Sequence, residues 1–165
     1  MHKIKIRKAE ATDVRAINNI LNFAILNTNY NLSTEPRNYE DGEKWFADHI
    51  RDGYPVIVAE LEGTVIGWAS LSRFRTYSGY NTTAEVSIYV SDNYRHKGVG
   101  TTLLNTLISM AGNYHCLIAV VTENNWASIA LHSKCGFIAN ASFKELGYKN
   151  GKYIDITLMS RILKD

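Results

Sequence analysis

The stretch "RHKGVG" at residues 95–100 places three basic side chains beside two glycines, where an apolar β-like run becomes a helix-like run. Backbone N–H groups at a helix start lack carbonyl partners within the helix, and the helix dipole favours negative charge there. Glycine has no Cβ, so Gly98 and Gly100 would let an anion approach the main chain closely. The stretch therefore predicts an anion site.

The spacing of these residues separates the stretch from two common phosphate loops. The pattern is Arg-x-x-Gly-x-Gly. It matches neither the G-x-x-x-x-G-K-[ST] loop of nucleoside triphosphatases nor the G-x-G-x-x-G loop of dinucleotide-binding proteins. ATP or a dinucleotide is therefore not the first expectation. Taken alone, the six residues are equally compatible with a helix that opens with basic side chains in solvent.

Glu85 is the second residue that could do chemistry, because it lies inside the apolar run "AEVSIYV". A carboxylate there must be paired or have a raised pKa, since charge is costly to desolvate. Amines are mostly protonated at neutral pH, and a desolvated carboxylate beside one could remove its proton directly or through a water. The alternative is a carboxylate on a strand edge that pairs with an arginine.

The loop "SRFRTYSGY" at residues 72–80 precedes the Glu85 run and mixes basic with aromatic side chains. The planar guanidinium of Arg75 could hold a carboxylate, and Phe74, Tyr77 and Tyr80 could wall a pocket. This composition favours a small amino-acid-like ligand. An exposed basic and aromatic loop is the alternative.

Hydrophobic periodicity predicts the elements that position these residues. Strands are expected at residues 3–7, 54–73 (a hairpin turned at Glu62 and Gly63), 83–90, 116–122 (buried), 137–148 and 153–161, and helices at 14–25, 39–53 (with Trp45, Phe46 and Ile50 inward), 98–114 and 125–137. The order is β-α-α-β-β-β-α-β-α-β-β. It predicts an α/β fold with a mixed sheet, helices on the faces of the sheet and a parallel crossover within 83–122.

Composition narrows the class of protein. The 165 residues fit one domain, 1–165, and 45% hydrophobic residues can build a core. Because 18 basic side chains nearly balance 16 acidic ones, nucleic acid and membrane surfaces are not expected partners. The two cysteines have no metal-ligand spacing, and no signal peptide or membrane-spanning stretch is evident, so no metal and a reduced cytoplasmic location are expected.

Several motifs in order resemble the GNAT N-acetyltransferases. Residues 95–100 resemble the coenzyme A pyrophosphate loop, [RQ]-x-x-G-x-[GA], and "ENNWASIALHSKCGF" at 123–137 resembles the second signature of the family. The resemblance covers the whole chain and looks closest to the phosphinothricin and methionine sulfoximine acetyltransferase branch. It implies acetyl-CoA as cofactor, a homodimer, and a mostly antiparallel sheet of about six to seven strands with four helices.

The resemblance assigns the coenzyme to three segments. The backbone at 95–101 would hold the pyrophosphate, a splayed strand at 87–90 would bond the pantetheine arm and the oxyanion, and Asn125 and Ser128 would bond the pantetheine amides. The implied cofactor-binding residues are Ile88, Tyr89, Val90, Arg95, His96, Lys97, Gly98, Val99, Gly100, Thr101, Asn125 and Ser128. The alternatives are a fully paired strand with a core-facing Ile88 and Val90, and a helix cap at Asn125.

The resemblance implies two catalytic residues, Glu85 as base and His132 as a possible acid for the leaving thiolate. Many members carry Tyr at the position of His132, and a helix-surface residue that contacts coenzyme A is the alternative. The implied substrate-binding residues are Phe74, Arg75, Thr76, Tyr77, Tyr80, Glu85, Val86 and Ser87, with weaker support for Tyr30 and Asn31. Transfer is expected to be direct, in a ternary complex.

The last hairpin departs from phosphinothricin enzymes. These resemble K-H-G-x-W-H-D, whereas "KNGKYID" at 149–155 has Asn150 and Ile154 at the two His positions. The sequence therefore favours acceptors such as methionine sulfoximine or sulfone. A protein N-terminus, a polyamine and a non-catalytic acyl-CoA sensor are the alternatives, although the basic 72–80 loop opposes a polyamine.

Overall fold

The computed structural model describes residues 3–163 and contains eleven strands and α-helices, joined by three short 3-10 turns. In chain order the strands and helices are β1 Lys5–Lys8, α1 Val14–Asn27, α2 Tyr39–Arg51, β2 Val56–Leu61, β3 Thr64–Arg73, β4 Thr83–Val90, α3 Val99–Met110, β5 Cys116–Thr122, α4 Trp126–Lys134, β6 Ile138–Lys149 and β7 Lys152–Ile162. This confirms the order expected from the sequence. Among the described residues no helix combines the length and apolarity needed to cross a membrane.

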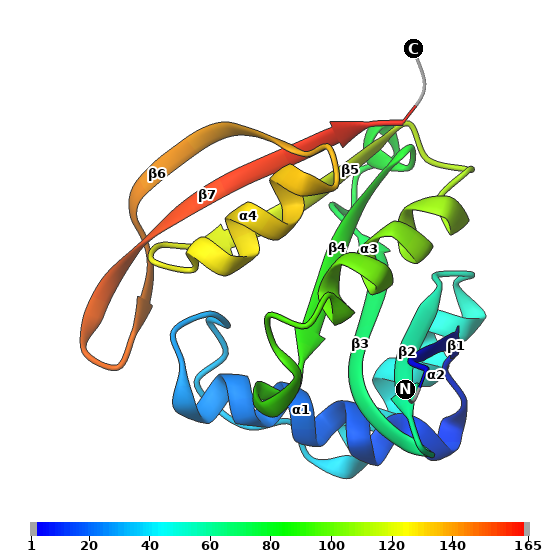
Figure 1. The fold of residues 1–165 in the computed structure, drawn as a ribbon. Coiled ribbons are helices and arrows are strands. Elements are labelled where there is room, and N and C mark those ends of the chain that lie inside the picture. Colours follow the sequence, from blue (N-terminus) through cyan, green and yellow to red (C-terminus); the bar gives the residue numbers. More distant parts are fainter. Residues whose placement is uncertain (1–2, 164–165) are drawn as a thin grey trace.

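The seven strands form one sheet in the order β1-β2-β3-β4-β5-β7-β6 (Figure 1). Every neighbouring pair is antiparallel except β4 and β5, which are parallel because α3 carries the chain back between them. The expected mixed, mostly antiparallel sheet with four α-helices is confirmed.

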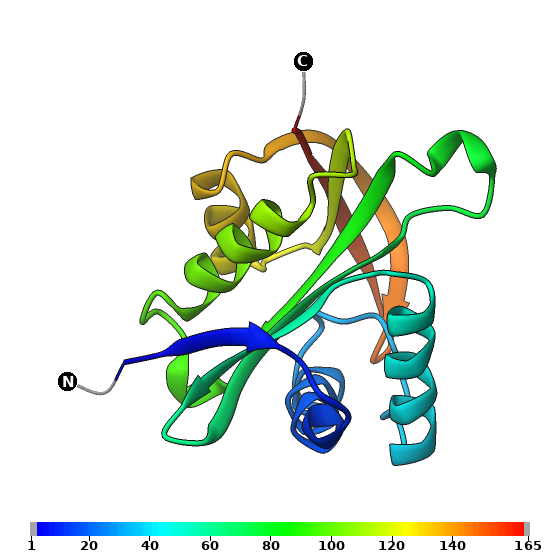
Figure 2. The ribbon, with the colours of Figure 1, turned by 90° about the vertical axis from the view of Figure 1, so that its right-hand side faces the viewer.

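Helices cover both faces of the sheet, with α1 and α2 on one side and α3 and α4 on the other (Figure 2). Strand β2 is a continuous apolar run because both of its faces are buried. Val56 and Val58 pack with α1, whereas Ile57 and Ala59 pack with α3. A strand buried on both faces has no polar side to show to water. The two cores thus hold α1 and α3 on opposite sides of β3 and β4.

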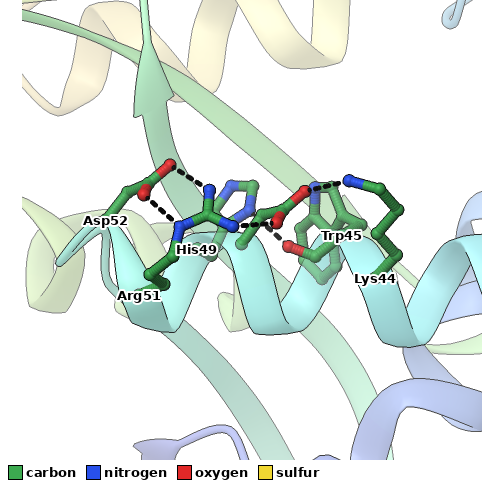
Figure 3. Close-up of polar contacts among 6 residues, drawn as sticks. Lys44, Trp45, His49, Arg51 and Asp52 are labelled. Carbon is green, nitrogen blue, oxygen red and sulfur yellow. Dashed lines mark hydrogen bonds and ion pairs between the residues drawn. The ribbon is translucent and has the colours of Figure 1, made fainter.

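Helix α2 differs from its expected form at its last turn. The prediction that Ile50 points inward is wrong, since Ile50 is 57% exposed. His49 takes the inward place instead, where it contacts the rings of Trp45 and Tyr54. The outer side of the helix carries Lys44–Asp48, Arg51–Asp48 and Arg51–Asp52 ion pairs, and His49 bonds the Trp45 carbonyl (Figure 3).

Helix α3 is shorter than expected, because it ends at Met110 and not at residue 114. Residues 111–115 form the turn into β5, where the Tyr114 N–H donates to the Ala111 carbonyl. The remaining strand and helix bounds lie within a few residues of their expected positions, which is the usual uncertainty for element ends.

The pairing of β4 with β5 is the feature of the fold that opens the site. Strand β4 pairs with β3 from Ala84 to Val90, but with β5 only from Thr83 to Glu85. Beyond Glu85 the two strands diverge (Figure 1). The β5 side of the second half of β4 is therefore not covered by a neighbouring strand.

Candidate active site

A cavity of about 680 Å³ occupies the place where β4 and β5 diverge. Its walls come from β4, β5, the first turn of α3, most of the length of α4 and the loop after α1, with single residues from α1 and β7. Fourteen of the site residues expected from the sequence line it: Glu85, Val86, Ser87, Ile88, Tyr89, Val90, Arg95, His96, Gly98, Gly100, Thr101, Asn125, Ser128 and His132. Tyr30 and Asn31 line it as well.

The start of α3 has the geometry of an anion site. The first hydrogen bond of the helix runs from the Thr102 N–H to the Gly98 carbonyl, so the amides before Thr102 precede the helical ladder. Gly98 is the N-cap residue with φ of 82°, a left-handed conformation that only glycine adopts without strain. His96 is also left-handed, with φ of 59°. Within this stretch, Gly98, Gly100 and Thr101 line the cavity.

Glycine is required at position 100 for a different physical reason than at position 98. A Cβ at Gly100 would lie 3.1 Å from Leu131 Cδ2 of α4, which is tighter than ordinary packing. The absent side chain lets α3 and α4 approach each other at the cavity. The expectation that both glycines serve close anion approach thus describes only part of their role.

Two residues of the same stretch do not line the cavity. Lys97 Nζ donates to the Asn93 carbonyl at 2.9 Å, and Val99, the first residue of α3, is 1% exposed in the core. Arg95 does line it, and its guanidinium lies 3.4 Å from Asp92 Oδ1. The ion pair ties Arg95 back onto the turn that follows β4.

The second half of β4 matches the expected splayed strand. Because β5 diverges after Glu85, the alternative of a fully paired strand at 87–90 is wrong. Ile88 and Val90 are half-buried against the core and also line the cavity, so each serves both roles. Amides on the β5 side of this segment can therefore bond a ligand in place of a strand.

Tyr89 lies on the opposite face of β4 and closes the cavity toward α1. Its ring stacks on Trp68 with centroids 5.0 Å apart, and its hydroxyl accepts a 2.7 Å hydrogen bond from Asn31 Nδ2. Burial raises the pKa of the Tyr89 hydroxyl above its ordinary value. Tyr89 is therefore a neutral hydroxyl that links β4 to the loop after α1.

Glu85 is half-buried where the β4–β5 ladder ends, and it lines the cavity. Burial raises the pKa of its carboxyl above the ordinary value, and the nearby charge of Arg75 opposes this rise. The side chain forms no ion pair within the described residues, so the alternative of a carboxylate paired with arginine at a strand edge is not what the structure shows. A carboxylate with a raised pKa can accept a proton near neutral pH.

Asn125 caps α4 and lines the cavity at the same time. Its side-chain oxygen accepts a 3.3 Å hydrogen bond from the Ser128 N–H, which is the helix cap expected as the alternative. The cap uses the oxygen, so the side-chain NH₂ group is the part that could donate to a ligand. The two roles are compatible.

His132 is 2% exposed, so the alternative of a helix-surface residue is wrong. Its Nδ1 lies 2.8 Å from the Ser128 carbonyl, which can only accept, and Nδ1 therefore carries a proton. Burial lowers the pKa of the imidazole below its ordinary value, so the ring is neutral and Nε2 is an acceptor. This tautomer does not present a proton from Nε2.

The expected acceptor loop lies beside the cavity and not in its wall. Phe74, Arg75, Thr76, Tyr77 and Tyr80 are absent from the lining, and the loop projects past the ends of β3 and β4 (Figure 2). Tyr77 is 77% exposed. Arg75 stacks over the Phe74 ring at 5.3 Å and is close enough to Glu85 to affect its pKa.

Sequence reasoning missed apolar residues of the cavity wall, Leu32, Val120 and Ile156, and also Thr122. Strand β5 is not buried throughout as expected, because Val120 is 42% exposed toward the cavity. Thr122 Oγ1 is buried with no hydrogen-bond partner among the described residues. The alternation of Val120 and Thr122 along β5 is the signal that could have found them.

Comparison with known proteins agrees with this geometry. Residues 21–137 match the acetyltransferase (GNAT) family. An L-methionine sulfoximine/L-methionine sulfone acetyltransferase of Pseudomonas aeruginosa is 36% identical over 157 residues, which span 93% of this chain and 91% of the relative.

Two crystal structures are similar over nearly the whole chain. A phosphinothricin acetyltransferase of Sinorhizobium meliloti in complex with acetyl-CoA superposes with a TM-score of 0.93 at 34% identity, covering 96% of this chain and 88% of that one. A ribosomal-protein-alanine N-acetyltransferase of Brucella melitensis has a TM-score of 0.94 at 39% identity, covering 96% and 99%. The two differ in the acceptor that they are named for.

Proposed function

The chain belongs to the GNAT acetyltransferase family and is an acetyl-CoA-dependent N-acetyltransferase, and we propose that its acceptor is the primary amine of a small amino acid of the methionine sulfoximine or sulfone type. One observation carries the proposal: a desolvated carboxylate, Glu85, lies in the same cavity as the uncovered half of β4. This arrangement supports a role for Glu85 as a base beside a segment that could hold a thioester.

The coenzyme side of the cavity supports the following roles. Backbone amides of residues 96–101 hold the pyrophosphate at the start of α3, since the Arg95 amide already donates to the Asp92 carbonyl. The side chains of Arg95 and Lys97 add positive charge, and His96 lines the cavity. Amides of Ile88 to Val90 bond the pantetheine arm, and one of them stabilises the oxyanion. The NH₂ group of Asn125 and the Ser128 hydroxyl bond the pantetheine amides.

The chemical step follows from Glu85. In the proposed reaction Glu85 takes a proton from the bound ammonium, and the free amine attacks the thioester carbonyl. A C–N bond forms, the C–S bond breaks, and the thiolate of coenzyme A leaves. The second proton, which the nitrogen loses as the amide forms, passes to the released thiolate through solvent. We propose that the thiolate leaves without an acid from His132, since the His132 tautomer presents an acceptor and thiols ionise near neutral pH.

Direct transfer fits the two cysteines. Burial raises the pKa of both Cys116 and Cys135, which disfavours the nucleophilic thiolate, and neither residue lines the cavity. A covalent acetyl-enzyme therefore has no suitable nucleophile among them, and the proposed mechanism proceeds through a ternary complex.

The acceptor is proposed to lie between Glu85 and the loop at residues 74–80. Arg75 would hold its carboxylate, and the loop would close over the entrance with Phe74, Thr76, Tyr77 and Tyr80, above the strand segment that includes Val86 and Ser87. The apolar wall of Leu32, Val120 and Ile156 would contact the acceptor side chain. An amino acid with a partly apolar side chain fits this combination.

Thiol release from acetyl-CoA tests the proposal. Methionine sulfoximine, phosphinothricin, spermidine and a peptide that begins with alanine are compared at equal concentration. We expect the highest kcat/KM with methionine sulfoximine. Release only with the peptide would overturn the acceptor assignment and favour the second candidate, a protein N-terminus, which the similarity to the ribosomal-protein-alanine enzyme supports.

The oligomeric state and location belong to the same proposal. We propose one domain over 1–165, of which residues 1–2 and 164–165 lie outside the described part, and a cytoplasmic homodimer that binds neither nucleic acid nor membrane. The dimer is supported by exposed apolar side chains of the β6–β7 hairpin, since Ile138, Leu146 and Tyr153 are each more than half exposed. Sedimentation equilibrium tests it, and a monomer at micromolar concentration would contradict it.

A further inference from the structure

A lysine with no place in the proposed reaction is among the most buried side chains of the protein. Lys149, the last residue of β6, is 2% exposed. Its Nζ donates three hydrogen bonds to backbone carbonyls, of Ile25 at 2.7 Å, Thr28 at 3.0 Å and Asn31 at 2.6 Å. All three acceptors lie more than a hundred residues away along the chain, at the end of α1 and in the loop that follows it.

Three bonds are all that an ammonium group can donate, so the lysine is fully satisfied. Ile25 belongs to the last turn of α1, where carbonyls lack helical partners and the helix dipole favours a cation. Burial by itself lowers the pKa of Lys149. The three hydrogen bonds to carbonyls and the negative end of the α1 dipole favour the charged form of Lys149. Together they explain how a buried charge is held there.

Two further contacts join the same hairpin to the same loop. Asn150 Nδ2 donates to Asn29 Oδ1 at 3.0 Å. A Cβ on Gly147 would lie 2.8 Å from Leu32 Cδ1, so the absence of a side chain at Gly147 lets Leu32 sit against β6. In Figure 1 the tip of the β6–β7 hairpin lies beside this loop.

The other side of the loop faces the cavity. Tyr30, Asn31 and Leu32 line it, and Asn31 Nδ2 also donates to the Tyr89 hydroxyl on β4. Lys149 itself is not part of the lining. Any effect of Lys149 on a ligand must therefore pass through the backbone of residues 28–32.

We propose that Lys149 is a positioning residue for the acceptor, which fixes the wall of Tyr30, Asn31 and Leu32 by bonding the loop carbonyls behind it. The inference rests on the proposed function, because it takes this wall to contact the acceptor and the opposite end of the cavity to hold acetyl-CoA. Lys149 then affects acceptor binding and leaves coenzyme binding unchanged.

The test replaces Lys149 with methionine, which keeps the length of the side chain but removes the three donors. The matched control is Lys152→Met, an exposed lysine in the first position of β7 on the same hairpin. For Lys149→Met the KM for methionine sulfoximine should rise about tenfold or more, because small displacements of a positioning wall are costly. The Kd for acetyl-CoA, measured by calorimetry, should not change, and Lys152→Met should alter neither value.

A purely structural role would give a different result. It would lower the melting temperature and the amount of folded enzyme, but the folded fraction would keep its KM for the acceptor. An unchanged acceptor KM in folded Lys149→Met would therefore overturn the inference. If this variant does not fold, Gly147→Ala tests the same wall through Leu32 and should raise the same KM.

A second measurement tests the role of Lys149 without any acceptor, so that its result does not depend on which acceptor the enzyme uses. Amide hydrogen exchange is compared between the wild type and the two lysine variants without substrate. The Thr28 N–H donates to the Ala24 carbonyl at the end of α1, and the Tyr30 and Ser33 N–H groups donate to Thr28 Oγ1 and Asn31 Oδ1 in the loop. These three amides should exchange faster only in Lys149→Met. Unchanged exchange would overturn the inference, whereas failure of the wild type to turn over any amino acid would overturn only the proposed acceptor.

Discussion

Glu85 meets two requirements that oppose each other. A general base must be ionised to accept a proton, yet its affinity for that proton must be high enough for transfer near neutral pH. Partial burial supplies the affinity by raising the pKa, and the charge of Arg75 limits the rise. The loop that we propose to bind the acceptor therefore also adjusts the base that deprotonates it.

Replacement of Glu85 with glutamine should lower kcat/KM about a hundredfold or more, a typical contribution of general base catalysis. The loss should be largest between the raised pKa of Glu85 and the pKa of the acceptor amine, and it should shrink in alkaline solution, where the amine is already neutral. Acetyl-CoA affinity should stay normal.

Thiol release over a range of pH, with Glu43→Gln as an exposed control on α2, provides the measurement. A glutamine variant with the wild-type rate at neutral pH would exclude Glu85 as the base.

Arg75 provides a second prediction at this scale. Arg75→Ala should raise the KM for amino acids about tenfold or more, since a charged hydrogen bond to the carboxylate is lost. The KM for an amine of the same shape without the carboxylate should not change. Initial rates with the two acceptors decide the matter, and equal effects on both would remove the proposed carboxylate clamp.

At the scale of elements, the order of strands and helices was predictable because their hydrophobic periods are regular. The turn before α3 was predictable as well, since glycines between an apolar strand and an amphipathic helix mark a junction. Its use as an anion site followed from the resemblance and stays a prediction. Strand β4 stops pairing with β5 after Glu85. Residues 83–90 alone do not reveal this, because the separation of the two strands depends on how β5 and α3 pack. The resemblance to a family supplied that expectation.

Other features depend on contacts that no local pattern contains. Gly100 is explained by Leu131 of another helix, and Lys149 by carbonyls at the far end of the chain. Ile50 follows the helical period but is displaced from the core by His49. In each case the partner is distant in sequence or of an unexpected type.

The turn before α3 can be tested by comparing Gly98 with Gly63, which has the same backbone conformation in another turn. Gly98→Ala and Gly63→Ala both place alanine at a positive φ, of 82° and 78°, with no atoms near the added Cβ. Each should lose about 1 kcal/mol of stability. Only Gly98→Ala should weaken acetyl-CoA binding, because Gly63 lies in the β2–β3 turn, away from the cavity.

Urea unfolding gives the stability of the two variants, and calorimetry gives their affinity for acetyl-CoA. Equal affinities would mean that the turn at Gly98 does not hold the coenzyme.

At the scale of the whole molecule, the buried His132 and the half-buried His49 couple stability to pH. Burial lowers the pKa of His49 and of His132 below the ordinary value of 6.5. Between the lowered value and 6.5 the unfolded chain binds more protons than the folded one, so stability falls as pH decreases. Glu85 acts in the opposite direction, because its raised pKa lets the folded protein bind a proton earlier.

The free energy of unfolding should therefore decrease between about pH 7 and pH 5, with a slope of up to about 1.4 kcal/mol per pH unit for each histidine. His49→Gln/His132→Gln should flatten this slope, and Glu85→Gln should steepen it. Denaturant titrations at several pH values measure both effects. A slope that is the same in the double histidine variant would show that other groups control it.

The short β4–β5 seam also has a mechanical consequence. Within the sheet, only Thr83–Cys116, Ala84–Leu117 and Glu85–Ile118 join the first four strands to the last three. A ligand that spans the gap and bonds both β4 and β5 links the two parts of the sheet where they share few residue pairs. If the proposed ligands bond both sides of the gap, filling and emptying the cavity would change how stiffly the two halves of the sheet are held during each catalytic cycle.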